Sequence, residues 1–387
     1  MSEPAGDAQR PIYLDHNAST PVVPEVLAAM LPFFTSEYGN PSSQHSYGKR
    51  ARDAVEEARA EVARMISASP GEITFTSGGT ESNNLAIFGA SAAKPYRHGV
   101  VTSAVEHPAV RVPLGRLTRD GAKVHVLGVD RAGRVSVQEA RGVIGDSTLL
   151  VTVMLANNET GAVQPIAELG ALAEQHGALL HVDASQALGK VAVDVRELHA
   201  SLLTIAGHKM YAPKGVGALF IRAGSMIAPR LLGASHERGM RPGTENVPGI
   251  VGLGAAARVL LESLEAERSR QRELANRLFA GLAARVPGLR LNGPALEDDA
   301  RLPNTVSVAF PGVWGRQVLA HAPGVAASTG AACHDGAESA SPGILALGYS
   351  EEEARGTVRL SLGRGTTAEQ IDRAVENLSD GYRTAQG

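Results

Sequence analysis

Seven short apolar runs between residues 72 and 222, each bounded by turn-forming residues, limit the fold more than any other feature of the chain. Helical stretches separate several of these runs. Strands that are apolar on both faces are typical of a largely parallel sheet covered by helices on both sides. The sequence therefore predicts an α/β fold with a mainly parallel seven-stranded sheet. The runs are EITFTSG from Glu72, VVTSAV from Val100, KVHVLGV from Lys123, LLVTVMLA from Leu149, ALLHVDAS from Ala178, LLTIAG from Leu202 and GALFIR from Gly217.

A second, smaller domain is predicted toward the end of the chain. A long helical pattern over residues 252–285 is interpreted as the crossover between domains. It is followed by fewer strand-like runs, NTVSVAF from Asn304 and VRLSLGR from Val358, and by an amphipathic helix over residues 368–382. We expect residues 16–262 to form the large domain, and residues 1–15 and 263–387 to form a smaller α+β domain. A cleft between two domains is a common place for small-molecule chemistry.

Charge and composition exclude several classes of function. The net charge of −3 and the absence of a dense Lys/Arg block argue against nucleic acid as a partner. The longest apolar run, residues 249–261, is short and contains Arg258, so no membrane span is expected. The first ten residues lack the apolar core of a signal peptide, and the single cysteine permits no internal disulfide, so we expect a cytoplasmic protein. The histidines have no metal-ligand spacing, and no metal is expected.

Two charged residues follow buried strands and could face one ligand. Lys209 is the one lysine of six that follows an apolar run directly, in Gly207-His208-Lys209, and Asp183 ends the preceding run. Carboxyl ends of parallel strands meet at one edge of a sheet. A lysine that forms an imine and a carboxylate that keeps a pyridine nitrogen protonated are the pair that pyridoxal phosphate requires. The alternative is a plain salt bridge between the two side chains.

A phosphate site is suggested by the string TSGGTES from Thr76, which lies between a strand and a helical segment. Backbone N–H groups at a helix start attract a phosphate. The string is neither a nucleotide P-loop nor a dinucleotide fingerprint, so it indicates a phosphate without indicating ATP or NAD. A simple helix-capping turn is the alternative.

Cys333 and Arg359 are two further candidates. Cys333 lies in a glycine-rich stretch of small and polar residues next to His334, a setting that suits a thiolate nucleophile, although a lone cysteine is often an inert core residue. Arg359 projects from the apolar run VRLSLGR, where a guanidinium could bind a carboxylate, or form a structural salt bridge.

The ordered motifs resemble those of the cysteine desulfurase and selenocysteine lyase family, in the class V branch of the fold-type I enzymes that depend on pyridoxal 5'-phosphate. The resemblance runs nearly end to end. It rests on YLDHNASTP from Tyr13, GNPSS from Gly39, FTSGGTESNN from Phe75, VEHPAV from Val105, MLANNETG from Met154, HVDASQALGK from His181, GHKMYAPKG from Gly207, HERGMRPGTEN from His236, STGAACH from Ser328 and VRLSLGR from Val358.

The resemblance implies a role for each matching residue. Lys209 would bond covalently to the cofactor and move protons, Asp183 would bond the pyridine nitrogen, and His107 would stack on the ring as a further catalytic residue. Gln186 would contact the ring hydroxyl, and Asn158 would contact both cofactor and substrate. Arg359 would bind the substrate carboxylate. The residues expected to hold the phosphate are Gly79, Thr80 and His208, with Thr244 contributed by the second subunit of a homodimer.

The reaction implied for the family converts L-cysteine to L-alanine, leaves a persulfide on Cys333 and passes the sulfur to an acceptor protein. The chain departs from the iron–sulfur desulfurases in two ways. Ala206 replaces a serine expected two residues before His208, which removes one expected hydroxyl from the phosphate. The strings GAACH and LTIAGHK are closer to those of selenocysteine lyases, which makes a selenocysteine lyase the alternative. More distant alternatives are a class V aminotransferase or C–S lyase acting on another amino acid, and a binding scaffold that has lost its cofactor.

Overall fold

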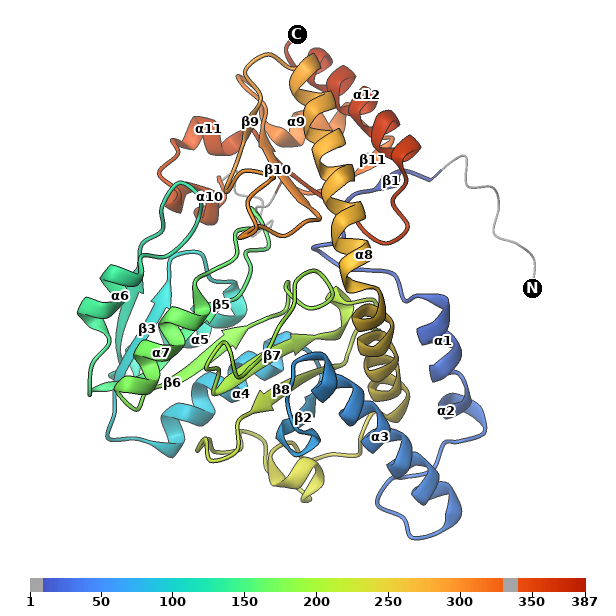
Figure 1. Ribbon diagram of the computed structural model, residues 1–387, viewed down its shortest axis with the longest axis vertical. Coiled ribbons are helices and arrows are strands. Elements are labelled where there is room, and N and C mark those ends of the chain that lie inside the picture. Colours follow the sequence, from blue (N-terminus) through green and yellow to red (C-terminus); the bar gives the residue numbers. More distant parts are fainter. Residues whose placement is uncertain (1–9, 330–339) are drawn as a thin grey trace.

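A computed structural model of the protein describes residues 10–329 and 340–387. It has a larger α/β region and a smaller region, with one long helix running from the first into the second (Figure 1). The seven-stranded sheet of the larger region has the order β2-β8-β7-β6-β5-β3-β4. All neighbouring strands run parallel except those next to β8, which is antiparallel to both β2 and β7.

Each of the seven predicted runs forms one strand of this sheet, so the predicted α/β fold is confirmed. Buried apolar side chains fill both faces of the central strands, as a parallel sheet between two helix layers requires. The strands are β2 (Ile73–Thr76), β3 (Gly99–Ser103), β4 (Lys123–Leu127), β5 (Thr148–Met154), β6 (Leu179–Asp183), β7 (Leu202–Ala206) and β8 (Gly217–Ile221).

Two layers of helices cover the sheet. Alternate strand residues point to opposite layers: Val100 packs with α4 (Gly79–Ala93) and α5 (Pro108–Arg119), whereas Val101 belongs to the core on the other face. The second face is covered by α3 (Ser46–Met65), α6 (Val137–Val143), α7 (Ile166–Gln175) and the first part of α8 (Val247–Arg285). Two short helices, α1 (Pro24–Met30) and α2 (Pro32–Thr35), pack against α8, and 3-10 turns occupy Pro70–Glu72, Gly207–Lys209 and His236–Gly239.

The smaller region is built on an antiparallel sheet of order β12-β10-β9. The N-terminal segment joins this region, because β1 (Ile12–Tyr13) pairs with β11 (Val325–Ala326) and Leu14 is buried in its core. The remaining elements are β9 (Arg290–Leu291), β10 (Thr305–Ala309), α9 (Gly315–Ala320), α10 (Pro342–Ala346), α11 (Glu351–Arg355), β12 (Thr357–Ser361) and α12 (Ala368–Ala385). The division at residues 262 and 263 stays a prediction.

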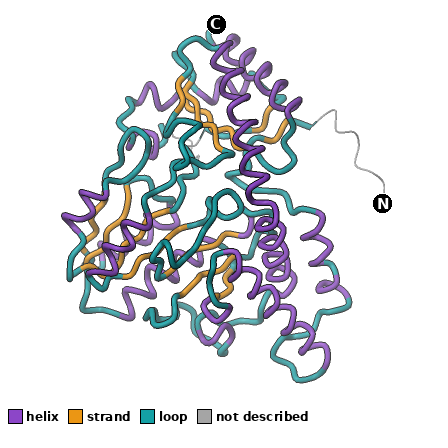
Figure 2. The backbone as a smooth tube through the Cα atoms, viewed as in Figure 1, coloured by secondary structure: helices purple, strands orange, loops and turns teal. Residues whose placement is uncertain are grey.

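The long helix α8 belongs to both cores. Leu253 and Leu260 are buried in the core of the large sheet, whereas Leu278 and Leu282 are buried in that of the smaller region. Figure 2 shows the helix as one continuous element. By length and composition α8 could cross a membrane, but 56% of its most apolar window is buried, which is the situation of a core helix.

Candidate active site

A cavity of about 930 Å³ opens at the carboxyl ends of β5, β6 and β7. The large sheet supplies most of its wall, and Ser328, Ser341 and Arg359 close it from the smaller region. This volume suits a cofactor and a small substrate. The predicted site residues that line it are Gly79, Thr80, His107, Asn158, Asp183, Gln186, His208, Lys209 and Arg359.

One end of the cavity is formed by the start of α4. Gly78 has a φ of +146°, which only glycine adopts readily, and it turns the chain from β2 into the helix. No side chain caps this helix, so its first N–H groups are available to an anion. His208 lines the same cavity, and burial and the charges of Lys209 and Lys214 lower the pKa of His208 to about 4. The N–H groups at the start of α4 and the His208 ring are groups that could hold a phosphate.

Asp183 ends β6 with both carboxylate oxygens hydrogen-bonded. Nδ2 of Asn83 donates to Oδ2 over 2.8 Å. The backbone N–H and the hydroxyl of Ser185 donate to Oδ1 over 3.0 and 2.5 Å. These donors fix the orientation of the carboxylate.

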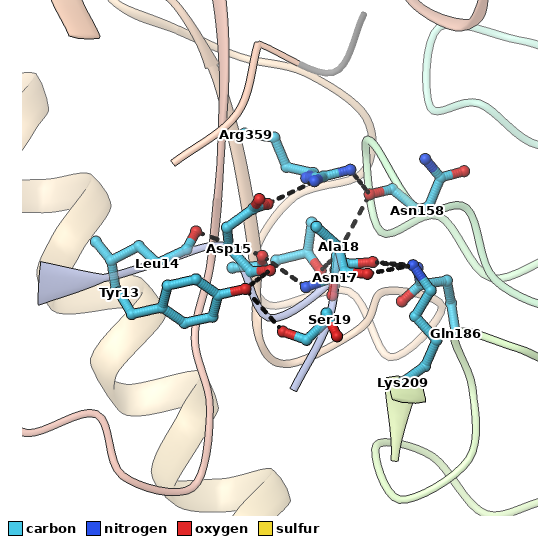
Figure 3. A network of polar contacts seen from close by, with 12 residues as sticks. Tyr13, Leu14, Asp15, Asn17, Ala18, Ser19, Asn158, Gln186, Lys209 and Arg359 are labelled. Atoms are coloured by element: carbon cyan, nitrogen blue, oxygen red, sulfur yellow. Dashed lines mark hydrogen bonds and ion pairs between the residues drawn. The ribbon is translucent and has the colours of Figure 1, made fainter. Parts of the chain in front are cut away.

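Lys209 faces the same cavity, but no ion pair joins it to Asp183 in the described residues. Its Nζ donates instead to the backbone oxygens of Asn17 and Ala18, over 2.7 and 2.8 Å (Figure 3). Burial and, to a smaller extent, the nearby Arg359 guanidinium lower the pKa of Lys209 to about 8, against the carboxylates of Asp15 and Asp183. The plain salt bridge is therefore absent, and an amine with a lowered pKa points into the cavity.

Arg359 forms the structural salt bridge that is the alternative role for it, and its guanidinium also lines the cavity. Its Nη2 donates to Oδ1 of Asp15 over 2.6 Å, and its Nη1 donates to the backbone oxygen of Asn158 over 3.3 Å. The Nε atom is buried and has no partner in the described structure. The ion pair thus orients a guanidinium that still has donor capacity at the wall of the cavity.

His107 caps the start of α5 and accepts a hydrogen bond at Nδ1 from the N–H of Ala109, over 3.1 Å. Because Nδ1 is an acceptor, the neutral ring carries its proton on Nε2. Enclosure by the protein lowers the pKa of His107, and the charges of Lys209 and Arg111 act in the same direction against Asp183. The ring is therefore neutral near pH 7, as a stacking partner for a pyridine ring should be.

Two predicted site residues remain, one of which is described by the structure. Thr244 is exposed and lies outside the cavity wall of this chain. Cys333 lies outside the described residues. Ala206 lies in the wall next to Gly79, so the predicted loss of a hydroxyl at this position concerns the phosphate end of the cavity.

Several residues of the site were missed in the sequence. Glu106 is buried beside His107, and burial, with a smaller effect from the charge of Asp183, raises its pKa to about 8. Glu159 is also buried at the cavity wall, where burial raises its pKa and its carboxylate accepts a hydrogen bond from the Ser341 hydroxyl. Asn17 and Lys190 are buried behind Lys209. All four lie inside the quoted motifs, but the resemblance assigns roles only to other residues of those motifs or, for the motif that contains Asn17, to none.

The comparisons with known proteins agree with this geometry. The family model described as aminotransferase class-V matches residues 12–374. The chain belongs to the class V aminotransferase family. It is 43% identical over 370 residues to cysteine desulfurase NifS of Azotobacter vinelandii, covering 95% of this chain and 91% of that protein. It is 42% identical over 370 residues to cysteine desulfurase IscS of Clostridium botulinum, covering 95% and 93%.

Solved structures of similar chains share the class V architecture. A NifS-like protein superposes with a TM-score of 0.89 at 34% identity, covering 95% of this chain and 98% of that one. SspA in complex with cysteine superposes with a TM-score of 0.80 at 34% identity, covering 90% and 98%. Class V family members of this kind are enzymes that depend on pyridoxal phosphate, and the uncapped start of α4, the fixed Asp183 carboxylate and the Lys209 amine fit that cofactor.

Proposed function

We propose that this class V enzyme is a cysteine desulfurase, which converts L-cysteine to L-alanine and keeps the sulfur as a persulfide on Cys333. One observation carries the proposal: an amine, a carboxylate and a guanidinium, those of Lys209, Asp183 and Arg359, face a single cavity. The first two suit pyridoxal phosphate, and the third suits the carboxylate of an amino acid. The relatives named cysteine desulfurase support this choice of amino acid.

The cofactor, when bound, supplies an electron sink for the bonds around the α-carbon of the amino acid. Lys209 would hold it covalently and exchange protons with the substrate. Asp183 would keep the pyridine nitrogen protonated, Gln186 would contact the ring hydroxyl, and His107 would stack on the ring. Gly79, Thr80 and His208 would hold the phosphate at the start of α4, and Asn158 would contact both cofactor and substrate.

Cys333 would take the sulfur. Its thiolate attacks the substrate sulfur, an S–S bond forms, and the bond between that sulfur and the β-carbon breaks. The carbon keeps the electron pair and takes up a proton, and the amino acid leaves as alanine. The sulfur stays on Cys333 until an acceptor protein removes it.

The test is alanine release from cysteine and from selenocysteine, by the native protein and by Cys333→Ala. We expect the native protein to release alanine from cysteine and the variant to lose that activity. Because Cys333 is the only cysteine of the chain, a mass gain of one sulfur atom after turnover can only be located there. Full cysteine activity in Cys333→Ala contradicts the persulfide step. Turnover of selenocysteine alone identifies a selenocysteine lyase instead, and amino transfer to a keto acid without alanine release identifies an aminotransferase.

A further inference from the structure

A second buried lysine, Lys190, lies behind the cofactor lysine. Its Nζ donates to Oε1 of Gln186 over 2.8 Å and to Oδ1 of Asn17 over 3.0 Å. No carboxylate forms an ion pair with it in the described part of the chain. Burial lowers the pKa of Lys190 well below its ordinary range, and the charges of Lys209 and Arg359 lower it further. Burying an amine without a counter-ion costs free energy, and the two hydrogen bonds of Lys190 offset part of that cost.

The first of these bonds leads to Lys209. Since Nζ of Lys190 donates to Oε1 of Gln186, Nε2 of Gln186 is turned away from the lysine. Nε2 then donates to the backbone oxygen of Asn17 over 2.9 Å. That same oxygen accepts the hydrogen bond from Nζ of Lys209 over 2.7 Å. The orientation of one amide therefore fixes the acceptor that holds the cofactor lysine.

The second bond leads to Arg359. Oδ1 of Asn17 accepts from both Lys190 and Nδ2 of Asn304, so Nδ2 of Asn17 faces the other way. It donates there to the Thr305 hydroxyl over 2.8 Å and to the backbone oxygen of Asn158 over 3.2 Å. That oxygen also accepts from Nη1 of Arg359. Figure 3 shows both branches meeting at Asn17, between Gln186 and Lys209 on one side and Asn158 and Arg359 on the other.

We propose that Lys190 is a positioning residue of the active site, which fixes, through the amides of Gln186 and Asn17, the carbonyl oxygens that hold Lys209 and Arg359. An apolar side chain of similar length would fill the space but leave the Gln186 amide free to turn. The Asn17 amide would lose one of the two donors to its Oδ1 and would still be held by Asn304 and Thr305. A glutamine would add an acceptor and allow the opposite orientation. The inference rests on the proposed function, since it assigns Lys209 to the cofactor and Arg359 to the amino acid.

The test compares Lys190→Met with Lys123→Met, an exposed lysine on the edge strand β4. Three quantities are measured: the melting temperature, the dissociation constant of pyridoxal phosphate by equilibrium dialysis, and KM and kcat for alanine release from cysteine. In Lys190→Met we expect a native or higher melting temperature, because a buried amine without a counter-ion is lost. We expect weaker cofactor binding and a higher KM, each by about tenfold or more, since small displacements of reacting groups are costly. Lys123→Met should match the native protein in all three.

A double variant tests the route through the amide. If Lys190 acts through Gln186, adding Lys190→Met to Gln186→Ala should weaken cofactor binding by less than Lys190→Met does alone. Native cofactor affinity and native KM in Lys190→Met overturn the proposal. A lower melting temperature together with weaker cofactor binding and lower activity also overturns it, because that combination indicates a lysine that stabilises the fold as a whole. If Lys190→Met does not fold, Lys190→Gln replaces it, and a native-like Lys190→Gln overturns the proposal. Cofactor affinity is measured without substrate, so the result stands even if the native protein releases no alanine from cysteine.

Discussion

At the scale of single residues, burial lowers the pKa values of the basic side chains that line the cavity. Lys209 has a lowered pKa because it is buried near Arg359 and donates to carbonyl oxygens rather than to a carboxylate. His107 and His208 lie close to it with lowered pKa values and add no positive charge near neutral pH. Asp183 therefore lines the cavity together with one amine and two imidazoles whose pKa values are all lowered.

The pKa of Lys209 makes capture of the cofactor depend on pH. Only the deprotonated amine attacks a carbonyl carbon, and below the pKa its fraction falls about tenfold per pH unit. We expect the rate at which cofactor-free protein turns yellow with pyridoxal phosphate to rise with pH and level off above about 8. Stopped-flow absorbance between pH 6 and 10 measures this rate, with Lys209→Ala as the control that captures no cofactor. A rate that still rises steeply at pH 10 contradicts the lowered pKa.

The site residues that the sequence predicts are those whose residue type, at its position in the chain, indicates a chemical role. Lysine after a core strand, aspartate at the end of the next strand and a glycine-rich turn before a helix each indicate one role, and the structure places all of them in one cavity. Asn17 gives no such signal, because its partners come from five segments that only the fold brings together, at residues 158, 186–190, 209, 304–305 and 361. Lys190 follows a glycine like a surface turn residue, and its burial comes from packing around it.

At the scale of elements, the ends of β3 and β5 are joined by one carboxyl group. Oε1 of Glu106 accepts hydrogen bonds from the hydroxyl of Ser103, over 2.5 Å, and from the N–H of Met154, over 3.0 Å. Ser103 ends β3 and Met154 ends β5, and His107 follows Glu106 directly. The Glu106 carboxyl group therefore links the ends of β3 and β5 at the edge of the sheet where the cavity opens.

Burial of Glu106 predicts a pH dependence of stability. The folded pKa of about 8 exceeds the ordinary value of 4.5, so between these values the folded protein retains a proton that the unfolded chain has lost. The free energy of unfolding should therefore fall as the pH rises through this window, by up to about 1.4 kcal/mol per pH unit from this group. Glu106→Gln keeps both hydrogen bonds at Oε1 and should remove that slope. Urea unfolding at several pH values between 5 and 8 measures it, and equal slopes in the two proteins would contradict the expectation.

The turn between β2 and α4 gives a second prediction at this scale. Gly78→Ala forces a side chain into a backbone conformation that L residues rarely adopt, which costs about 1–3 kcal/mol or moves the helix start. We expect weaker binding of pyridoxal phosphate, measured by equilibrium dialysis, together with a lower melting temperature. Gly71→Ala is the matched control, because Gly71 has an ordinary φ and open space around it. Equal cofactor affinity in the two variants would show that the turn does not set the phosphate site.

At the scale of the whole molecule, the segment before α8 is held in an unusual conformation and presents Thr244 to the exterior. Glu237 and Arg238 have φ values of 46° and 54°. Both guanidinium nitrogens of Arg59 donate to the Glu237 carboxylate over 2.8 Å, and the N–H of Phe75 donates to it as well. A buried bidentate ion pair thus fixes a segment whose exposed threonine the resemblance assigns to a second subunit.

A mixed dimer tests that assignment. Lys209→Ala removes the cofactor lysine, and Thr244→Asp places a negative charge where a phosphate is expected, so each variant alone should be inactive or nearly so. If Thr244 serves the partner, a dimer of one chain of each kind has one site with both defects and one native site. Co-expressed chains with different tags should therefore regain activity and up to half of the cofactor content. No gain over the two separate variants would place Thr244 outside the partner's site.

The strands and helices could be predicted from the sequence more fully than the boundary between the two regions. Apolar strands and helix patterns report local structure, and all seven large-sheet strands were foreseen. The start of α8 at Val247, before the expected Gly252, follows from the cap of Asn246, whose side chain accepts from the N–H of Gly249. Such a cap decides where a helix begins without changing its apolar pattern.

The continuity of α8 has a mechanical consequence. A helix of 39 residues is about 58 Å long, and its backbone hydrogen bonds run unbroken from one core into the other. A loop between the two regions would act as a hinge, whereas this connection behaves as a stiff lever, which yields by bending rather than by turning. A displacement of one half of α8 therefore moves the other half as well. The wall that carries Arg359 can shift against the large sheet when α8 bends.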